Sequence, residues 1–168
     1  MTDQIAVGDR VVLEVGFDAA RARLRIVARD GMLQWASELA YGESITGLVT
    51  LAGREAGLTR LATVRLGDLA ETCDHAHIAL RWEAIAADGK LFTALDADLM
   101  LAPAGDQVTA LALAGAYRPQ PGPGGAGLDR EIIRGCAATA IGTFLGRVAR
   151  LVVHPAGTAG HAGRTCET

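Results

Sequence analysis

The segment Cys73-Asp74-His75-Ala76-His77 gathers the side-chain types that bind transition metals. Thiolate, carboxylate and imidazole groups are the usual protein ligands of zinc. His75 and His77 are two residues apart, so they share one face if a β-strand begins before them. No third and fourth ligand follow at the spacing of a metal site. We therefore predict that the chain binds neither a metal nor a cofactor.

Asp96 and Asp98 are the two carboxylates that could support acid–base chemistry. They fall in a predicted strand, residues 91–101, which follows Asp88-Gly89, a dipeptide typical of a type I′ hairpin turn. A hairpin with its tip at Asp88-Gly89 places Arg81 directly opposite Asp96 on the outer face of the sheet. This register predicts an exposed ion pair and no catalytic residue. A register shifted by one residue would turn all three side chains inward and make them the best polar site of the chain.

The elements that position these residues alternate in an order typical of an α+β protein. Strands are predicted at 10–15, 45–51, 58–66, 77–85, 91–101 and 108–117, and helices at 18–29, 31–41 and from Asp129 to Val152. Asp18 is placed to cap the first helix, and Gly42 to end the second. The order β-α-α-β-β-β-β-β-α predicts a curved antiparallel sheet of about six strands that wraps around the long C-terminal helix. Residues 1–152 are expected to form this single domain, followed by a disordered tail at 153–168.

The hairpin register also predicts which side chains face the final helix. Trp82 lies opposite Leu95, and a turn at 103–107 then sets Leu99 against Leu111. The predicted inner face consists of Ile78, Leu80, Trp82, Leu95, Leu99, Leu111, Leu113 and Tyr117. It meets an apolar stripe of the helix, formed by Ile133, Ala137, Ala140, Phe144 and Val148.

The space between the sheet and the final helix is predicted to contain a cavity. Ala97, Ala137 and Ala140 fall where bulky side chains would be needed to fill it. Trp82 and Tyr117 each carry a polar atom that needs a partner when it is buried. A mostly apolar pocket with few polar groups is typical of a small-molecule site. The predicted ligand-binding residues are Leu80, Trp82, Leu95, Leu99, Leu111, Leu113, Tyr117, Arg118, Ile133, Ala140 and Phe144, with Arg118 and the glycine-rich segment 122–127 near the mouth.

Composition and charge narrow the class of protein. Of the 168 residues, 50% are apolar and 21% are charged, and the net charge is −3. This charge predicts no general affinity for nucleic acid or for anionic membrane surfaces. The three cysteines share no metal or redox spacing, which is typical of reduced thiols in a cytoplasmic protein. No signal-peptide pattern follows Met1, and charges interrupt the apolar stretches before the ~20 residues of a membrane span. We expect a cytoplasmic protein without such a span.

Several segments together resemble an uncharacterised, actinobacterial-type branch of the SRPBCC superfamily. They are Arg81-Trp82-Glu83-Ala84, Leu91-Phe92, Leu95-Asp96-Ala97-Asp98-Leu99, Gly115-Ala116-Tyr117-Arg118-Pro119 and Gly127-Leu128-Asp129-Arg130. The superfamily includes START lipid-transfer domains, birch-pollen-allergen-like proteins and polyketide cyclase/dehydrases. The resemblance covers residues 10–152 and implies a helix-grip fold. It also implies a hydrophobic cavity, which in different members accepts sterols, lipids, polyketides or plant-hormone-like molecules.

Three functions are compatible with these observations. The first is binding or transport of a small hydrophobic molecule, such as a lipid, sterol or polyketide, in the internal cavity. The second is a cyclase, aromatase or dehydratase, for which Tyr117 is the one plausible proton-transferring residue of the inner face. The third is an interaction module whose inner face is an ordinary filled core. Such a module would form a homodimer through the outer row of Ala110, Ala112, Ala114 and Ala116.

Overall fold

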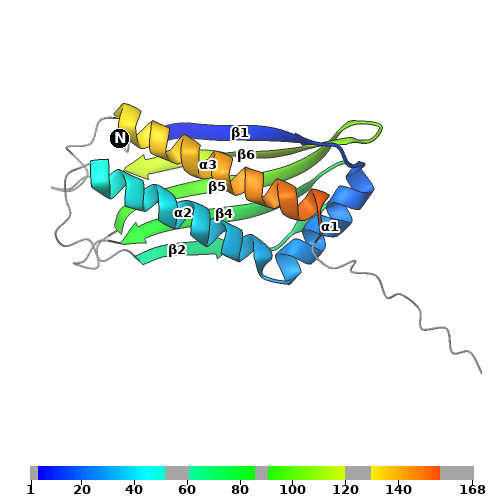
Figure 1. Ribbon diagram of the computed structural model, residues 1–168, viewed down its shortest axis with the longest axis horizontal. Helices are drawn as coiled ribbons and strands as arrows, with labels where there is room; N and C mark the ends of the chain where they lie inside the picture. Colours follow the sequence, from blue (N-terminus) through cyan, green and yellow to red (C-terminus); the bar gives the residue numbers. More distant parts are fainter. Residues whose placement is uncertain (1–3, 52–60, 86–90, 120–129, 156–168) are drawn as a thin grey trace, which may run out of the picture.

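The computed structural model describes residues 4–51, 61–85, 91–119 and 130–155, which form one antiparallel sheet and three helices (Figure 1). The elements are β1 (Ile5–Leu13), α1 (Phe17–Arg29), α2 (Met32–Leu51), β2 (Leu61–Leu66), β3 (Ala70–Glu71), β4 (Ala76–Ile85), β5 (Leu91–Gly105), β6 (Val108–Pro119) and α3 (Arg130–Val153). The strand order is β1-β6-β5-β4-β2, and the short β3 pairs with β4. The α+β class, the antiparallel sheet of about six strands and the long C-terminal helix are confirmed. The order β-α-α-β-β-β-β-β-α also matches, although β3 was not predicted and the predicted strand 45–51 is absent.

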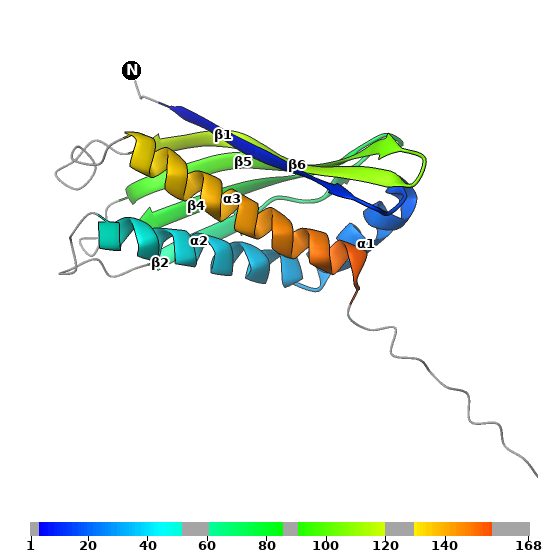
Figure 2. The same ribbon diagram turned by 45° about the horizontal axis from the view of Figure 1, so that its top comes forward.

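The sheet and the helices form two layers. Helices α2 and α3 lie side by side along one face of the sheet, and α1 lies at one end of the domain (Figures 1 and 2). Arg147 of α3 pairs with Glu43 of α2 at 2.8 Å, and the Ser44 hydroxyl donates to the Cys136 carbonyl oxygen at 3.0 Å. The final helix thus covers the sheet as predicted, but α2 shares that layer with it.

The register between β4 and β5 is confirmed. Trp82 pairs with Leu95, and Arg81 pairs with Asp96. Alternation along the two strands therefore turns the leucines and the indole toward the helices and the acids toward the outer face. The predicted turn at Asp88-Gly89 lies outside the described residues, and the register shifts between Ala84 and Ile85.

The predicted register between β5 and β6 is wrong by two residues. Leu99 pairs with Leu113 instead of Leu111. β5 continues to Gly105, so the connection is a tight turn at Asp106-Gln107, with an irregularity between Pro103 and Gly105. A shift by two keeps every side chain on its face because side chains alternate with a period of two. The predicted inner face therefore survives the error.

The second helix differs most from the prediction. Residues 45–51, predicted as a strand, continue α2, and Gly42 lies within the helix instead of ending it. Trp35 and Leu39 are four residues apart, as expected for one face of a helix, but this face is exposed: Trp35 is 50% exposed and Leu39 is 37% exposed. The side chains that face the sheet are Leu33, Ala36, Ser37, Ala40 and Tyr41, which are fully buried.

The first strand and helix also depart from the prediction in detail. β1 spans Ile5–Leu13, whereas the sequence predicts a strand at 10–15. Gly16 occupies the N-cap of α1 and makes no side-chain cap hydrogen bond. Asp18 lies in the first turn, where its charge favours the helix dipole and its carboxylate pairs with Arg21 at 3.0 Å. It therefore does not cap the helix.

The apolar character of α3 is explained by its packing. Residues Arg134–Val153 are long and apolar enough to cross a membrane by length and composition, which the sequence interpretation did not expect. Their apolar stripe is buried in the domain core, so the helix is a core helix. The stripe consists of Ala137, Ala140, Ile141, Phe144, Leu145, Val148 and Val152. The predicted disordered tail lies almost entirely outside the described residues.

Candidate functional site

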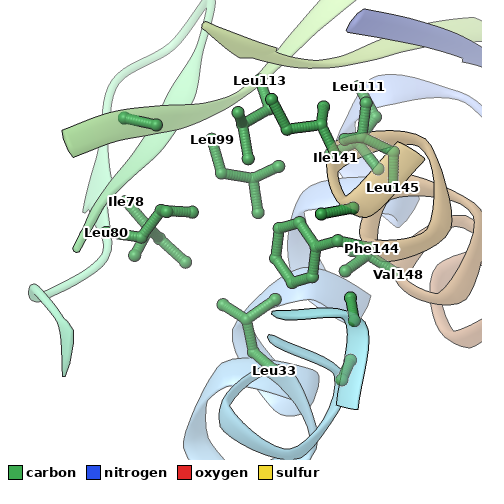
Figure 3. Packing of buried hydrophobic residues seen from close by; sticks show 14 of the residues in the cluster. Leu33, Ile78, Leu80, Leu99, Leu111, Leu113, Ile141, Phe144, Leu145 and Val148 are labelled. Carbon is green, nitrogen blue, oxygen red and sulfur yellow. The ribbon is translucent and has the colours of Figure 1, made fainter. Parts of the chain in front are cut away.

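The predicted inner face forms one continuous apolar cluster with α2 and α3. All the sheet residues predicted for it are buried, with exposed fractions of 5% or less: Ile78, Leu80, Trp82, Leu95, Leu99, Leu111, Leu113 and Tyr117. Figure 3 shows Phe144 of α3 lying between the leucines of the sheet and Leu33 of α2. Because α2 also covers this face, the two helices and the sheet enclose the site residues together.

An aromatic group occupies the middle of this cluster. The Tyr41 ring stacks on Trp82 with centroids 5.1 Å apart, and Phe144 meets Trp82 edge-on at 5.6 Å. The Trp82 indole N–H donates a hydrogen bond to the Ser37 hydroxyl of α2. The polar atom of Trp82 thus has the partner that burial requires. These contacts fix the Trp82 ring between the two helices.

Beside the aromatic group, one row of the inner face carries two small residues in its middle. Ala97 of β5 pairs with Gly115 of β6, and the next residues in this row are Leu80 and Val7. On α3, Ala137 and Ala140 are buried. Small buried residues are therefore present in both layers. Sequence reasoning found Ala97 and the helix alanines but missed Gly115, because the wrong register paired Ala97 with Leu113.

Hydroxyl groups are the polar groups at this part of the inner face. Tyr117 is buried, and so is Thr93, whose hydroxyl donates to the Arg118 carbonyl oxygen at 3.5 Å. The Tyr41 residue is 1% exposed, and its hydroxyl oxygen is buried without a hydrogen-bond partner in the described part of the chain. Leaving such a group unpaired costs about 1–3 kcal/mol, and native proteins rarely do so. Tyr41 is therefore the group of this site that most needs a partner.

Burial changes the acid–base chemistry of both phenols. Loss of solvation raises the pKa of Tyr117 to about 12, although the hydrogen bond with Thr93 acts in the opposite direction. Burial raises the pKa of Tyr41 as well, and the nearby Tyr117 adds to the effect. Both groups hold their protons at neutral pH and act there as hydrogen-bond donors.

These shifts predict alkaline unfolding. The pKa of Tyr117 in the folded protein lies above the unfolded value of about 10. The contribution of its protonated phenol to folding stability is therefore complete below pH 10 and is lost as the pH rises toward 12. Each phenol should lower the free energy of unfolding by about 1.4 kcal/mol per pH unit in this window. The chain has two tyrosines, so tyrosinate absorbance should rise in one step together with loss of circular dichroism. Phenols that titrate near their ordinary pKa in a folded protein would contradict this burial.

One predicted ligand-binding residue lies on the outer face, and the side chain of another lies outside the described residues. Arg118 points to the outer face, where its guanidinium pairs with Asp96 at 2.6 Å. Asp96 also pairs with Arg81 at 3.0 Å, as predicted, and Arg81 pairs in turn with Glu83 at 2.6 Å. Ile133 belongs to α3, but its side chain lies outside the described residues.

The outer face holds a depression of about 480 Å³ beside this ion network. Its charged lining comprises Arg65, Arg81, Asp96 and Asp98, and Asp98 is exposed. Asp96 and Asp98 therefore face away from the helices, and the alternative register that would turn them inward is excluded. They cannot serve as acid and base for a molecule bound on the inner face.

The metal-type segment Cys73–His77 leads into the first residues of β4. The imidazole of His75 contacts Asp74 and Thr72 at 2.8 Å, and stacks on His77 with centroids 6.2 Å apart. Cys73 is an exposed free thiol. Within the described residues, no group of three or more His, Cys, Asp or Glu side chains is arranged to hold a metal ion. The glycine-rich segment 122–127, predicted near the mouth, lies outside the described residues.

Sequence reasoning missed the contributions of α2 to the site. Leu33, Ser37 and Tyr41 recur at intervals of four, and with Ala36 and Ala40 they form the buried stripe of an amphipathic helix. That spacing is visible in the sequence. It was obscured because Trp35 and Leu39, which are larger, fit a helical period on the opposite face.

The chain was compared with known proteins at three levels. No family model matches it, and no curated protein matches it. Among solved structures, it is similar to TTHA0849 from Thermus thermophilus, at 10% identity and a TM-score of 0.47, over 91% of this chain and 100% of that one. It is similar to the Zhui aromatase/cyclase from Streptomyces sp. R1128, at 11% identity and a TM-score of 0.38, over 92% and 99%. It is also similar to norcoclaurine synthase from Thalictrum flavum in complex with dopamine and hydroxybenzaldehyde, at 9% identity and a TM-score of 0.40, over 93% and 90%. Because the sequence identities and TM-scores are this low, the function has to be inferred from the residues of this chain.

Proposed function

We propose that this chain binds a small, mostly apolar molecule between the inner face of its sheet and helices α2 and α3. The observation that carries the proposal is the hydroxyl of Tyr41, which is buried beside this apolar face and has no hydrogen-bond partner in the described part of the chain. Such a group needs a polar partner, and apolar walls with few polar groups are typical of a small-molecule site. Membership of the SRPBCC superfamily, and of its uncharacterised branch, stays a prediction that agrees with this proposal.

The polar groups of the inner face support binding more than catalysis. Tyr41 and Tyr117 retain their protons at neutral pH, because burial raises the pKa of each phenol. The other buried polar residues in the described part of the chain are Ser37, Thr93 and Thr109, all of which carry hydroxyl groups. A cyclase or dehydratase would need a group that accepts a proton from its substrate. Hydroxyls that stay protonated orient a ligand, and this favours a carrier or sensor over an enzyme.

The interaction-module alternative has its own support on the outer face. Val12 is 59% exposed on β1, and Met100 is 42% exposed on β5. Ala112 and Ala114 lie on β6 between these two strands. Sedimentation velocity over a wide concentration range decides whether this face associates with a second copy. Self-association there and ligand binding on the inner face are independent, since the two surfaces lie on opposite sides of the sheet.

The proposal is tested by filling the space from the helix side. Ala140→Leu adds a bulky side chain between α3 and the sheet, so it should reduce the affinity for 1-aminoanthracene, a small apolar dye, by tenfold or more. A tenfold loss corresponds to about 1.4 kcal/mol, within the range that one excluded side chain can impose. The dye fluoresces more strongly outside water, so a fluorescence titration measures its dissociation constant.

The same helix offers a matched control. Ala138→Leu makes an identical change two residues away, at an exposed position. Its affinity for the dye should equal that of the unmodified chain. An equal loss of dye affinity in both variants, or no loss of affinity in either, would mean that the dye binds elsewhere and would contradict the proposal.

A further inference from the structure

The charged depression on the outer face of the sheet is a second place where a small molecule can bind. It measures about 480 Å³, and its lining comes from β4, β5 and the end of β2 with the residue that follows it. Gly67 and Ala79 belong to this lining, and the Gly67 N–H donates to the Ala79 carbonyl oxygen at 2.8 Å. Both residues have little or no side chain, so they leave the space between the charged residues open.

Two arginines of this depression lie directly opposite each other on neighbouring strands. Arg65 of β2 pairs with Arg81 of β4, and directly opposite side chains of an antiparallel pair lie close together. Like charges in such a pair repel each other unless an anion compensates them. Arg81 has two such anions, since its guanidinium donates to Glu83 at 2.6 Å and to Asp96 at 3.0 Å. Arg65 is exposed and has no carboxylate partner in the described part of the chain.

The carboxylates of the depression differ in the same way. Asp96 is shared between two cations, because it pairs with Arg81 at 3.0 Å and with Arg118 at 2.6 Å. Asp98 lies two residues further along β5 on the same face, is exposed, and has no cation partner among the residues that the structure describes. Within those residues, the depression therefore combines an unpaired cation, Arg65, with an unpaired anion, Asp98.

The sheet keeps these two unpaired charges apart. Arg65 lies in one row with Arg81 and Asp96, two strands away from β5, whereas Asp98 belongs to the next row. Two strand spacings of about 4.8 Å and a step of two residues along a strand separate the two backbones by about 12 Å. An arginine and an aspartate side chain together do not span this distance. A small molecule between them can contact both.

We propose that the depression binds a small zwitterion, with a carboxylate at one end and an ammonium group at the other. The carboxylate lies between Arg65 and Arg81, because a guanidinium presents parallel N–H donors that match two carboxylate oxygens. The ammonium group donates to Asp98. A simple anion fits less well, since Asp96 and Asp98 line the same space. The separation of the two charges favours ω-amino acids, and this site is independent of the proposed site on the inner face.

Three probes of equal size test this proposal. They are 4-aminobutyrate, pentanoate, which has a methyl group in place of the ammonium group, and 4-aminobutanamide, which has an amide in place of the carboxylate. The amide chemical shifts of Gly67 and Ala79 give each dissociation constant by NMR titration at low ionic strength, where exposed charges are least screened. We expect 4-aminobutyrate to bind about fivefold more tightly than either singly charged probe, the upper range for one exposed ion pair.

Two substitutions assign the ends of the ligand. Arg65→Gln should weaken the binding of 4-aminobutyrate and pentanoate about fivefold and leave 4-aminobutanamide unchanged. Asp98→Asn should weaken 4-aminobutyrate and 4-aminobutanamide instead. Arg10→Gln is the matched control, because Arg10 is an exposed arginine on the opposite edge strand, β1, and all three dissociation constants should stay the same.

The proposal would be overturned by equal affinity for the three probes or by no binding of 4-aminobutyrate. It would also be overturned if Arg10→Gln weakened binding as much as Arg65→Gln, because general electrostatic attraction would then explain the result. None of these outcomes affects the inner-face proposal, which is tested with an apolar dye on the other side of the sheet.

Discussion

Replacing Trp82 with alanine is expected to lower the free energy of unfolding by about 3–5 kcal/mol, the range found for large aromatic side chains in protein cores. Trp82 is 1% exposed and contacts Tyr41 and Phe144 through its ring. Its removal takes these contacts away and leaves Ser37 without its indole donor. Natural domains have about 5–15 kcal/mol of stability, so the loss is a large share of the total. Urea unfolding followed by circular dichroism measures it.

Trp35 provides the matched control for this substitution. It lies on α2, but its side chain is half-exposed and belongs to the face of the helix that points away from the sheet. Trp35→Ala should therefore change the free energy of unfolding by about 1 kcal/mol or less, as surface substitutions do. Comparable losses for the two tryptophans would mean that Trp82 is not the centre of the core.

Replacing Gly115 with alanine is expected to destabilise the protein by about 1–3 kcal/mol, the range that overpacking usually costs. A Cβ atom at this position would lie 2.5 Å from the Ala97 Cβ and 2.6 Å from the Ala97 Cα, and it would also overlap the Asp96 carbonyl oxygen. These are mostly backbone atoms of the paired strand, which cannot rotate away. The two strands would have to separate at this pair, because glycine lets them approach closely here.

A glycine-to-alanine substitution in α3 should have the opposite effect on stability. A Cβ at Gly146 would meet nothing within 4 Å, and the residue lies in the interior of a helix. Gly146→Ala should stabilise the protein by about 0.5–1 kcal/mol, since alanine loses less conformational freedom in a helix than glycine does. Thermal unfolding of both variants gives the comparison. A stabilising Gly115→Ala would show that β5 and β6 are not in the register described.

The sheet could be predicted from the sequence where local signals set its register. Asp88-Gly89 and the alternation of apolar and charged residues place Trp82 opposite Leu95 and Arg81 opposite Asp96, and the structure has both pairs. Where the connection had no such signal, the predicted register is wrong, as between β5 and β6. The error did not change which face each residue occupies, because it was an even number of residues.

The helix layer could not be predicted as well. The run Ile45-Thr46-Gly47-Leu48-Val49 combines β-branched residues with a glycine, which locally favours a strand over a helix. In the structure, it continues a 20-residue helix that packs beside α3. Tertiary packing overrides a weak local preference in this way. The misplaced end of α2 also hid Tyr41, whose hydroxyl has no partner in the described part of the chain.

The measurement that tests the central claim most directly is energy transfer from Trp82 to bound 1-aminoanthracene in a Trp35→Phe chain. Trp82 is part of the inner wall, so a dye bound between the sheet and the helices lies within a few ångströms of its ring. We predict strong quenching of Trp82 together with sensitised emission from the dye. Dye that binds without quenching Trp82, or that does not bind at all, would contradict a ligand site on the inner face.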